Sequence, residues 1–589
     1  MRESLREIEL KGVGVSPGVV HGPAFLLTSD DVRVVERPID EDEIPREIAR
    51  FEEAVIATRD QLREIQGRVE KAMGAKHAGI FDAHLLVVDD HSFMEEVIRG
   101  LRTMRRNVES VLSTVAERYS TVLAQLDDDY LRERAADVKD VTRRILRNLA
   151  GQSSSVLGHL REPCIVIAND LAPSDTATLD PKKVLGFATD LGSPTSHTAI
   201  MARALDIPAV VGLHDASVRV SQGDTVLLDG SKGLLILHPS PETLERYGQI
   251  AQARQNVRAQ LDRLRDAPAE TLDGYQIRLA ANIELPNDVE AVLRHGAAGI
   301  GLFRTEFMFL SRARAPDENE QARAYEQVAH RLAPADVVIR TMDIGGDKFA
   351  SSLKTPPEMN PFLGWRAIRF CLAQPQIFLT QLRAILRASV HRNVKIMYPM
   401  ISNVDEVIQA NRLLDQAKAE LKQQGVEFDE DIEVGIMIEV PSAALTARLM
   451  APHVRFFSIG TNDLIQYTLA VDRVNERITY LYEPTHPAIL QLIYHVVEVA
   501  RDHALWTSVC GEMAGDPVLA PLLLGLGVDE LSMSPHLLPL VKGMIRRMDY
   551  RHLERLAADA LQSESASAIM EQCRQLAQSA ASDICDIIS

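Results

Sequence analysis

The sequence predicts a multidomain α/β protein: a small α/β domain with an inserted helical bundle, a linking helix, and a C-terminal (β/α)₈ barrel. Three observations indicate this architecture. The chain has 589 residues, which is enough for three or four domains. Residues 106–150 contain no glycine or proline, and this helical region separates two groups of short apolar segments. Beyond residue 272, apolar segments alternate with helical ones eight times.

The composition is that of a soluble globular protein, with 46% hydrophobic and 25% charged residues. The formal net charge of −19 argues against binding to a nucleic acid or an anionic membrane. The charged N-terminus lacks the apolar core of a signal peptide, and no apolar run reaches transmembrane length. The five cysteines are scattered without metal-ligand spacing. We therefore expect a cytoplasmic protein.

The first 238 residues combine short strands with a helical block. Residues 13–27 contain apolar stretches broken by glycine and proline, which is typical of short strands. From about residue 41 to 149, apolar side chains recur at helical spacing, as Phe51, Val55 and Leu62 do. Strand patterns return at about Cys164. We therefore predict one α/β domain from residues 1–30 and 150–238, with a helical domain, residues 31–149, inserted into it.

A long polar helix and a barrel follow. Residues 241–266 form a long, mostly polar stretch that predicts a linking helix, within a linker of residues 239–271. The barrel is predicted over residues 272–575, before a C-terminal tail of residues 576–589. A doubly wound open sheet is the alternative, but the chain lacks a dinucleotide-binding fingerprint. The eight predicted strands span residues 277–284, 299–306, 337–346, 394–401, 433–440, 455–463, 506–514 and 529–535.

Polar and charged side chains gather where these predicted strands end, which is where active sites of such barrels lie. A strand buried on both faces tolerates few charges in its interior, so a whole ring of them is informative. Arginine suits phosphate or carboxylate, and paired carboxylates such as Glu439 and Asp463 suit Mg²⁺. The ring therefore indicates a small anionic substrate, such as a phosphate ester. Its members are Glu284, Arg304, Glu306, Arg340, Asp343, Glu439, Asn462, Asp463, Cys510 and Glu512.

A second candidate site is the segment "LGSPTSHTAIMARALDIPAVVG", residues 191–212. It predicts a helix that begins at His197, because apolar residues then recur at helical spacing. The unpaired N–H groups and the positive dipole end of a helix N-terminus favour an anion there. Thr195 or Ser196 can cap this helix, and Thr198 can add a hydroxyl donor. Neutral histidine is a good nucleophile, so this segment can accept a phosphoryl group on nitrogen.

These two sites together resemble a known family. The stretch "GSPTSHTAIMAR" is similar to the phosphohistidine motif of Enzyme I, the phosphoenolpyruvate–protein phosphotransferase of the bacterial phosphotransferase system. The barrel resembles the phosphoenolpyruvate-utilising enzymes in "GIGLFRTEFMFL", "VIRTMDIGGDK", "NPFLGWRAIR", "FFSIGTNDLIQYTLAVDR" and "CGEMAGD". The helical domain resembles Enzyme I in "ERAADVKDVTRRILRN". The resemblance covers nearly the whole chain, and it identifies the α/β domain as a phosphohistidine swivel domain.

The resemblance implies a role for each matching residue. His197 would be phosphorylated through Nε2, and Cys510 would be the acid that protonates the leaving enolate. Glu439 and Asp463 would hold Mg²⁺. One departure is visible, because Ser193 and Pro194 stand where the family usually has glycine and arginine. The residues expected to bind phosphoenolpyruvate are Arg304, Arg340, Arg366, Asn462, Asp463 and Arg473.

The resemblance also implies an activity and its partners. The phosphoryl group would pass from phosphoenolpyruvate to His197, and then to a histidine phosphocarrier protein of the HPr type that docks on the helical domain. The barrel of the family usually forms a homodimer. Three alternatives differ in activity: a nitrogen-type regulatory paralogue, an enzyme like phosphoenolpyruvate synthase or pyruvate phosphate dikinase, and a scaffold with a degenerate site. The dikinases would carry a nucleotide-binding domain, but this chain has the helical domain and no GxxxxGK loop.

Overall fold

The chain forms two compact units, Met1–Gln252 and Ala253–Ile588, in a computed structural model. Each unit has its own hydrophobic clusters. Among the described residues, no helix is both long and apolar enough to cross a membrane. The structure describes residues 7–588 apart from 28–33, 74–79, 125–128, 152–159, 161, 172, 177–178, 181–182, 194–195, 206, 311–314, 346–359, 474 and 476.

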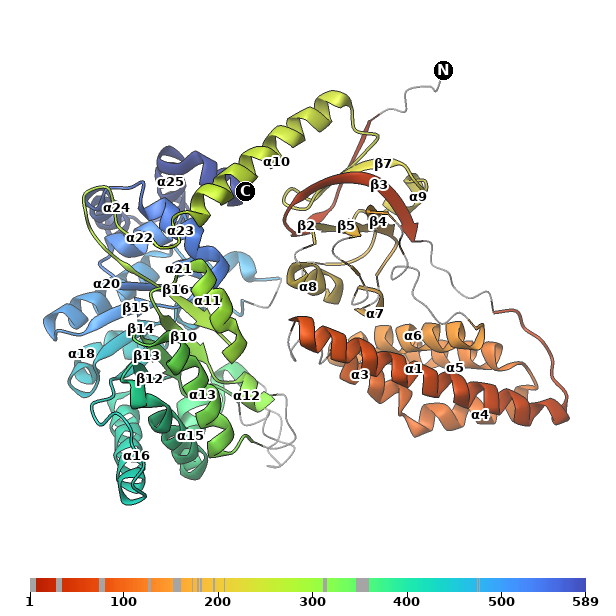
Figure 1. Cartoon of the computed structure of the whole chain (residues 1–589), viewed down its shortest axis with the longest axis horizontal. Helices are drawn as coiled ribbons and strands as arrows, with labels where there is room; N and C mark the ends of the chain where they lie inside the picture. The colour runs from red at the N-terminus through yellow and green to blue at the C-terminus, as the bar shows by residue number, and fades with distance from the viewer. Residues whose placement is uncertain are drawn as a thin grey trace. The chain divides into compact units, whose positions relative to one another are not determined.

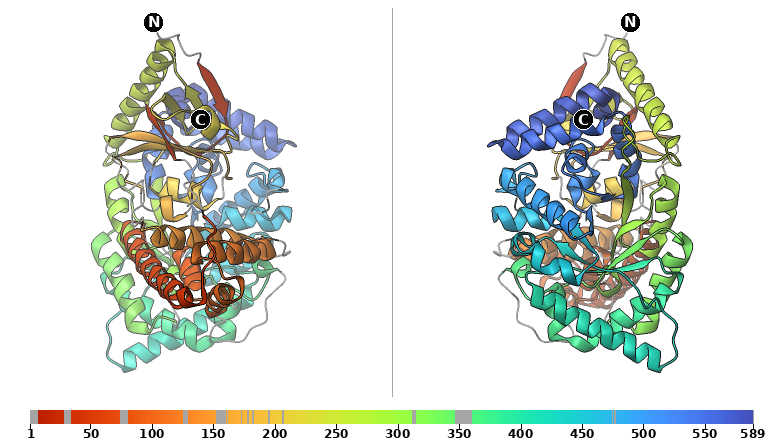
Figure 2. Two further views of the ribbon diagram at one scale, coloured as in Figure 1. Left: turned by 90° about the vertical axis from the view of Figure 1, so that its right-hand side faces the viewer. Right: turned by 90° about the vertical axis from the view of Figure 1, so that its left-hand side faces the viewer.

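The first unit contains the predicted helical bundle, red to orange in Figures 1 and 2. The predicted apolar face of α1 is confirmed, because Phe51, Val55 and Leu62 are buried in the bundle core. At the start of α4, the Asp90 carboxylate accepts from the N–H groups of Ser92 and Phe93, which caps the helix. The helices are α1 (Ile44–Met73), α3 (Ile80–Val88), α4 (His91–Met104), α5 (Val108–Ala124) and α6 (Asp129–Leu149).

The remainder of the first unit is a sheet with strand order β1-β8-β7-β3-β4-β5-β6-β2. The bundle lies between β3 and β4 in the chain, yet these strands pair in parallel. The helical block is therefore inserted into one α/β sheet. The strands are β1 (Ile8–Lys11), β2 (Val13–Ser16), β3 (Val19–Leu27), β4 (Cys164–Ala168), β5 (Val184–Thr189), β6 (Ala209–Val211), β7 (Thr225–Asp229) and β8 (Leu234–Leu237), with helices α7 (Pro173–Thr176), α8 (His197–Ala204) and α9 (Ala216–Arg219).

The alternating side chains of β4 explain why helices are needed on both faces of this sheet. Val166 and Ala168 pack in a cluster that includes residues of α8, while Ile165 and Ile167 pack in another that includes residues of α9. Helix α8 also reaches the bundle, since Met201 is fully buried in the bundle core. Figure 1 shows α7 and α8 on the side of the sheet that faces the helical bundle. The predicted linking helix is α10 (Pro241–Asp262).

The second unit contains a closed barrel of eight strands, and all eight lie within the predicted segments. Every neighbouring pair is parallel, and β16 pairs with β9 to close the barrel. The open-sheet alternative is therefore wrong. The strands are β9 (Arg278–Ile283), β10 (Ile300–Arg304), β11 (Val337–Arg340), β12 (Val394–Tyr398), β13 (Val434–Ile438), β14 (Phe456–Ile459), β15 (Trp506–Val509) and β16 (Glu530–Met533).

Helices connect the strands and surround the barrel (Figures 1 and 2). Residues 576–588 do not form a separate tail, because α25 continues through them and Ala577 and Ile584 pack in the barrel's main cluster. The helices are α11 (Val289–His295), α12 (Phe307–Leu310), α13 (Glu318–Leu332), α14 (Ala367–Ala373), α15 (Pro375–Ala388), α16 (Val404–Gln423), α17 (Pro441–Leu445), α18 (Ala447–Met450), α19 (Thr461–Leu469), α20 (Pro487–Asp502), α21 (Glu512–Gly515), α22 (Ala520–Gly525), α23 (Leu538–Ile545), α24 (Tyr550–Gln562) and α25 (Ala566–Ile588).

Candidate functional site

A cavity of about 420 Å³ opens at the carboxyl ends of the barrel strands. Side chains alternate along each strand, so the last inward position of several strands faces this cavity. On β10, Leu302 packs in a small apolar cluster inside the barrel, and Arg304 follows it two residues later at the cavity. Of the twelve barrel residues that the sequence indicates, Glu512 is not among those that line the cavity. The other eleven do line it: Glu284, Arg304, Glu306, Arg340, Asp343, Arg366, Glu439, Asn462, Asp463, Arg473 and Cys510.

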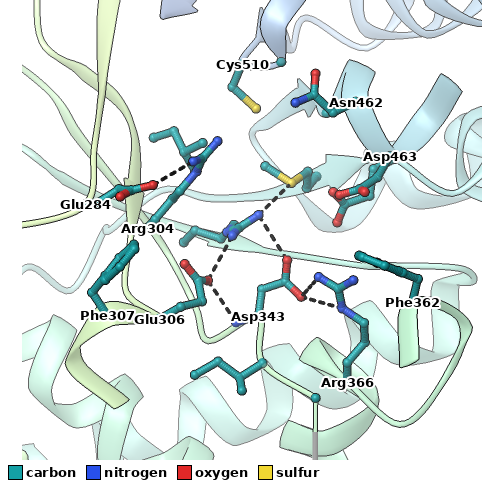
Figure 3. Close-up of a pocket in the computed structure, with 18 of the residues that line it drawn as sticks. Glu284, Arg304, Glu306, Phe307, Asp343, Phe362, Arg366, Asn462, Asp463 and Cys510 are labelled. Atoms are coloured by element: carbon teal, nitrogen blue, oxygen red, sulfur yellow. Dashed lines mark hydrogen bonds and ion pairs between the residues drawn. The ribbon is translucent and has the colours of Figure 1, made fainter. Parts of the chain in front are cut away.

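Two arginines and two carboxylates form a buried network at the end of β11 (Figure 3). The Arg340 guanidinium lies 2.9 Å from the Glu306 carboxylate and 3.2 Å from that of Asp343. Arg366 lies 2.7 Å from Asp343 as well, so one carboxylate joins both arginines. A backbone bridge between Gly345 and Arg366 brings the second arginine to this strand end. Both arginines are thereby held in position without a ligand.

Neighbouring charges oppose the effect of burial on Asp343 and Arg340. Burial by itself would raise the pKa of Asp343, but Arg340 and Arg366 beside it lower that pKa below its usual value. Burial also opposes the charge of Arg340, but Glu306 and Asp343 raise the pKa of its guanidinium. The pKa of Glu306 is raised, mainly by burial. Both guanidinium groups therefore stay charged and lie at the cavity, while the Asp343 carboxylate offsets part of their charge.

Three further candidates lie at the more exposed side of the cavity. Arg304 forms an ion pair of 3.0 Å with Glu284, and each side chain is about one-third exposed. The Asn462 amide donates to the Glu512 carboxylate at 3.1 Å, and its oxygen accepts from the Glu512 backbone N–H at 2.8 Å. Arg473 is exposed at the cavity edge. These side chains are accessible to a ligand that enters from solvent.

Glu439 and Asp463 supply two carboxylates from neighbouring strand ends. The Glu439 Oε1 atom accepts from the Met400 N–H at 2.6 Å, and Met400 takes a positive φ of 56° that is uncommon for its type. A Cβ atom at Gly460 would lie 3.0 Å from the Glu439 Oε2 atom, so glycine leaves room beside this oxygen. Burial, with Asp463 and Asp343 nearby, raises the pKa of Glu439 to about 8.

This carboxylate pair fits a divalent cation in charge and chemistry. Mg²⁺ prefers oxygen ligands, usually one or two carboxylates completed by substrate and water. A bound cation would remove the repulsion that disfavours the ionised form of Glu439. Among the residues that the structure describes, no group of three or more histidine, cysteine, aspartate or glutamate side chains could hold a metal. Substrate and water would supply the remaining ligands, as is usual for Mg²⁺.

Cys510 follows β15 and is buried above the apolar interior of the barrel. Its Sγ atom accepts a hydrogen bond of 3.4 Å from the Ser458 hydroxyl. Ser508 in turn donates to Ser458 at 2.9 Å. Burial raises the pKa of the thiol to about 11, so the group is protonated at neutral pH. A protonated thiol at the cavity wall can act as an acid.

His197 is the first residue of α8 and belongs to the first unit. The Ser196 hydroxyl caps this helix, since it accepts from the Ala199 N–H at 3.3 Å. Thr198 does not supply a free donor to an anion, because its hydroxyl donates to the Leu171 carbonyl at 2.8 Å. Thr195 and the side chain of His197 lie outside the described residues.

Sequence reasoning missed the roles of three residues at this site. Glu306 and Asp343 belong to the predicted ring, but only the structure shows that they hold the arginines. Spacing was a signal only for Asp343, which follows its partner Arg340 by three residues, whereas Glu306 follows Arg304 but pairs with Arg340. Ser458 has no signal in the sequence, since a serine inside an apolar strand does not reveal which side chain it contacts.

Three family models match the chain in order. The PEP-utilising enzyme N-terminal model matches residues 11–134, the mobile domain residues 160–233 and the PEP-binding domain residues 258–550. The chain is 44% identical to the phosphoenolpyruvate-protein phosphotransferase of Listeria innocua over 563 residues, covering 96% of this chain and 98% of the relative. It is 43% identical to the phosphoenolpyruvate-protein phosphotransferase of Haemophilus influenzae over 560 residues, which cover 95% of this chain and 97% of the relative. The chain therefore belongs to the PEP-utilising enzymes, and among them to the phosphoenolpyruvate-protein phosphotransferases.

Proposed function

We propose that this protein transfers the phosphoryl group of phosphoenolpyruvate to His197 and then to a histidine phosphocarrier protein, releasing pyruvate. The observation that carries the proposal is the cavity at the barrel mouth. Four arginines, two carboxylates suited to Mg²⁺, an asparagine and a buried thiol all line it. The relatives of this chain are phosphoenolpyruvate-protein phosphotransferases, which supports the same activity.

Substrate binding would depend on charges that are already in place. Arg340 and Arg366 are held by carboxylates before any ligand arrives, so little reorganisation is needed when an anion binds. Arg304 and Arg473 would contact the ligand from the accessible side. Glu439 and Asp463 would hold Mg²⁺, which would supply further positive charge to the phosphoryl oxygens.

The chemistry would consist of one displacement and one proton transfer. His197 attacks the phosphorus atom in line, and the bond between phosphorus and the enolate oxygen breaks. The arginines stabilise the charge on the transferred group and on the leaving enolate. Cys510 then donates its proton to the methylene carbon, which produces the keto form of pyruvate. This protonation makes the return reaction unfavourable.

The second transfer requires a partner that approaches His197. Helix α8 packs against the helical bundle through Met201. A carrier docked on the bundle would therefore lie on the same unit as His197. The net charge of −19 favours a carrier with a basic face. We further propose that the protein is cytoplasmic and forms a homodimer through its barrel.

Labelled phosphoenolpyruvate tests the proposal directly. With Mg²⁺, the wild-type chain should become an acid-labile phosphoprotein and release one pyruvate per label. His197→Ala should remove the label but keep phosphoenolpyruvate binding, because the cavity residues belong to the other unit. His21→Ala, an exposed histidine in β3 of the same unit, is the matched control and should label normally. Labelling of His197→Ala would refute the assignment.

A further inference from the structure

The inner surface of the barrel contains a short chain of hydroxyl groups beneath the cavity. Ser458 on β14 and Ser508 on β15 are register partners, and both are almost completely buried. The Ser508 hydroxyl donates to that of Ser458, which donates to the Cys510 Sγ atom. The chain of donors therefore reaches the thiol, which itself donates to the Ile459 carbonyl at 3.8 Å.

These serines stand out against their surroundings. The barrel interior next to Cys510 is an apolar cluster that includes Leu302, Met437 and Phe456. Branched apolar residues usually fill such layers, and a buried hydroxyl is costly unless it is hydrogen-bonded. Packing alone would be met by alanine or valine at these positions. Packing therefore does not explain the hydroxyl groups. Their hydrogen bonds lead to the Cys510 thiol, so we look for their role there.

We infer that Ser458 is a positioning residue for proton donation by Cys510, with Ser508 orienting the Ser458 hydroxyl. This inference rests on the proposed function. In the step concerned, the Cys510 S–H bond breaks and a C–H bond forms at the methylene carbon of the enolate. The electron pair of the S–H bond stays on sulfur, and the enolate oxygen becomes the carbonyl oxygen of pyruvate. The Ser458 O–H group donates to the thiolate that results.

The direction of the hydrogen bond suits this step. A hydroxyl that donates to sulfur forms a stronger hydrogen bond once the sulfur is an anion, because charge-assisted hydrogen bonds are stronger than neutral ones. The Ser458 contact therefore favours the state after proton transfer over the state before it. Burial raises the pKa of the Cys510 thiol, and the Ser458 hydrogen bond opposes that rise.

Single-turnover kinetics of the full chain tests this inference. Ser458→Ala should slow pyruvate release from phosphoenolpyruvate about tenfold, as expected for one hydrogen bond to a charged group. The KM for phosphoenolpyruvate and the transfer from phosphorylated His197 to the carrier should stay unchanged, since neither involves the thiol. Ser389→Ala is the matched control, because Ser389 is a fully buried serine with two hydrogen bonds outside the cavity.

A double-mutant cycle separates positioning from a structural role. In a Cys510→Ala background, Ser458→Ala should cause no further loss, because the hydroxyl then has no thiolate to stabilise. The same fold loss in both backgrounds, or wild-type pyruvate release by Ser458→Ala, would overturn the inference while leaving the proposed function standing. A wild-type chain that neither takes label nor releases pyruvate would overturn both.

Discussion

Glu530→Gln should stabilise the barrel, and it should do so only at neutral and alkaline pH. Glu530 is the first residue of β16, at the end of the barrel opposite the cavity. Its carboxylate is buried, lies 3.5 Å from Arg278, and has one oxygen without a hydrogen-bond partner among the described residues. Burial, together with nearby Asp336, raises its pKa to about 7, although Arg278 and Lys395 partly oppose this rise.

The size of this stabilisation follows from the pKa of the Glu530 carboxyl group in the folded and unfolded states. Its ordinary pKa is 4.5 and its folded pKa is about 7. At 1.36 kcal/mol per pH unit, ionising Glu530 in the folded state costs about 3 kcal/mol more than in the unfolded chain. The folded state holds the proton more tightly, so wild-type stability falls as the pH rises from about 4.5 to about 7. Glutamine stays neutral and resembles the protonated acid, while Arg278 keeps its 2.8 Å ion pair with Asp336.

Denaturant unfolding followed by tryptophan fluorescence provides the assay. The chain has two tryptophans, Trp365 and Trp506, and both belong to the second unit, so the signal reports this unit. We expect Glu530→Gln to match wild type at pH 4.5 and to exceed it by about 3 kcal/mol at pH 8. Glu433→Gln removes a carboxylate that is 42% exposed and paired with Lys395, and it should change stability by less than about 1 kcal/mol. Equal pH dependence in Glu530→Gln and wild type would refute the reasoning.

Three further predictions concern the proposed activity. Glu439→Ala and Asp463→Ala should each remove Mg²⁺-dependent labelling without unfolding the protein, and normal Mg²⁺ dependence in either would place the metal elsewhere. Gly460→Ala should raise the Mg²⁺ concentration for half-maximal labelling about tenfold, because the new Cβ would lie 3.0 Å from the Glu439 carboxylate; an unchanged Mg²⁺ titration would contradict this. A fragment of residues 1–254 should exchange phosphate with a phosphorylated carrier, more slowly at raised salt, but take none from phosphoenolpyruvate; labelling of the fragment by phosphoenolpyruvate would show that the barrel is dispensable.

Much of the fold and the candidate site could be predicted from local sequence. The eight barrel strands are short apolar segments between helical ones, so their number and order are visible along the chain. The carboxyl ends of parallel strands meet at one end of a barrel, so the sequence alone predicts that Arg304, Glu439 and Cys510 lie close together. Helix α8 begins at His197 for an equally local reason, since Ser196 is a favourable capping residue.

Tertiary structure alone decided which side chain each of these residues contacts. The Asp343 carboxylate joins Arg340 and Arg366, because a bridge at Gly345 brings a distant segment to the end of β11. The hydroxyl of Ser458 reaches Cys510 only because β14 and β15 pair in one particular register. Residue type and spacing determine secondary structure through short-range sterics and solvation. Contacts between distant residues depend instead on strand register and packing, which form only when the whole barrel closes.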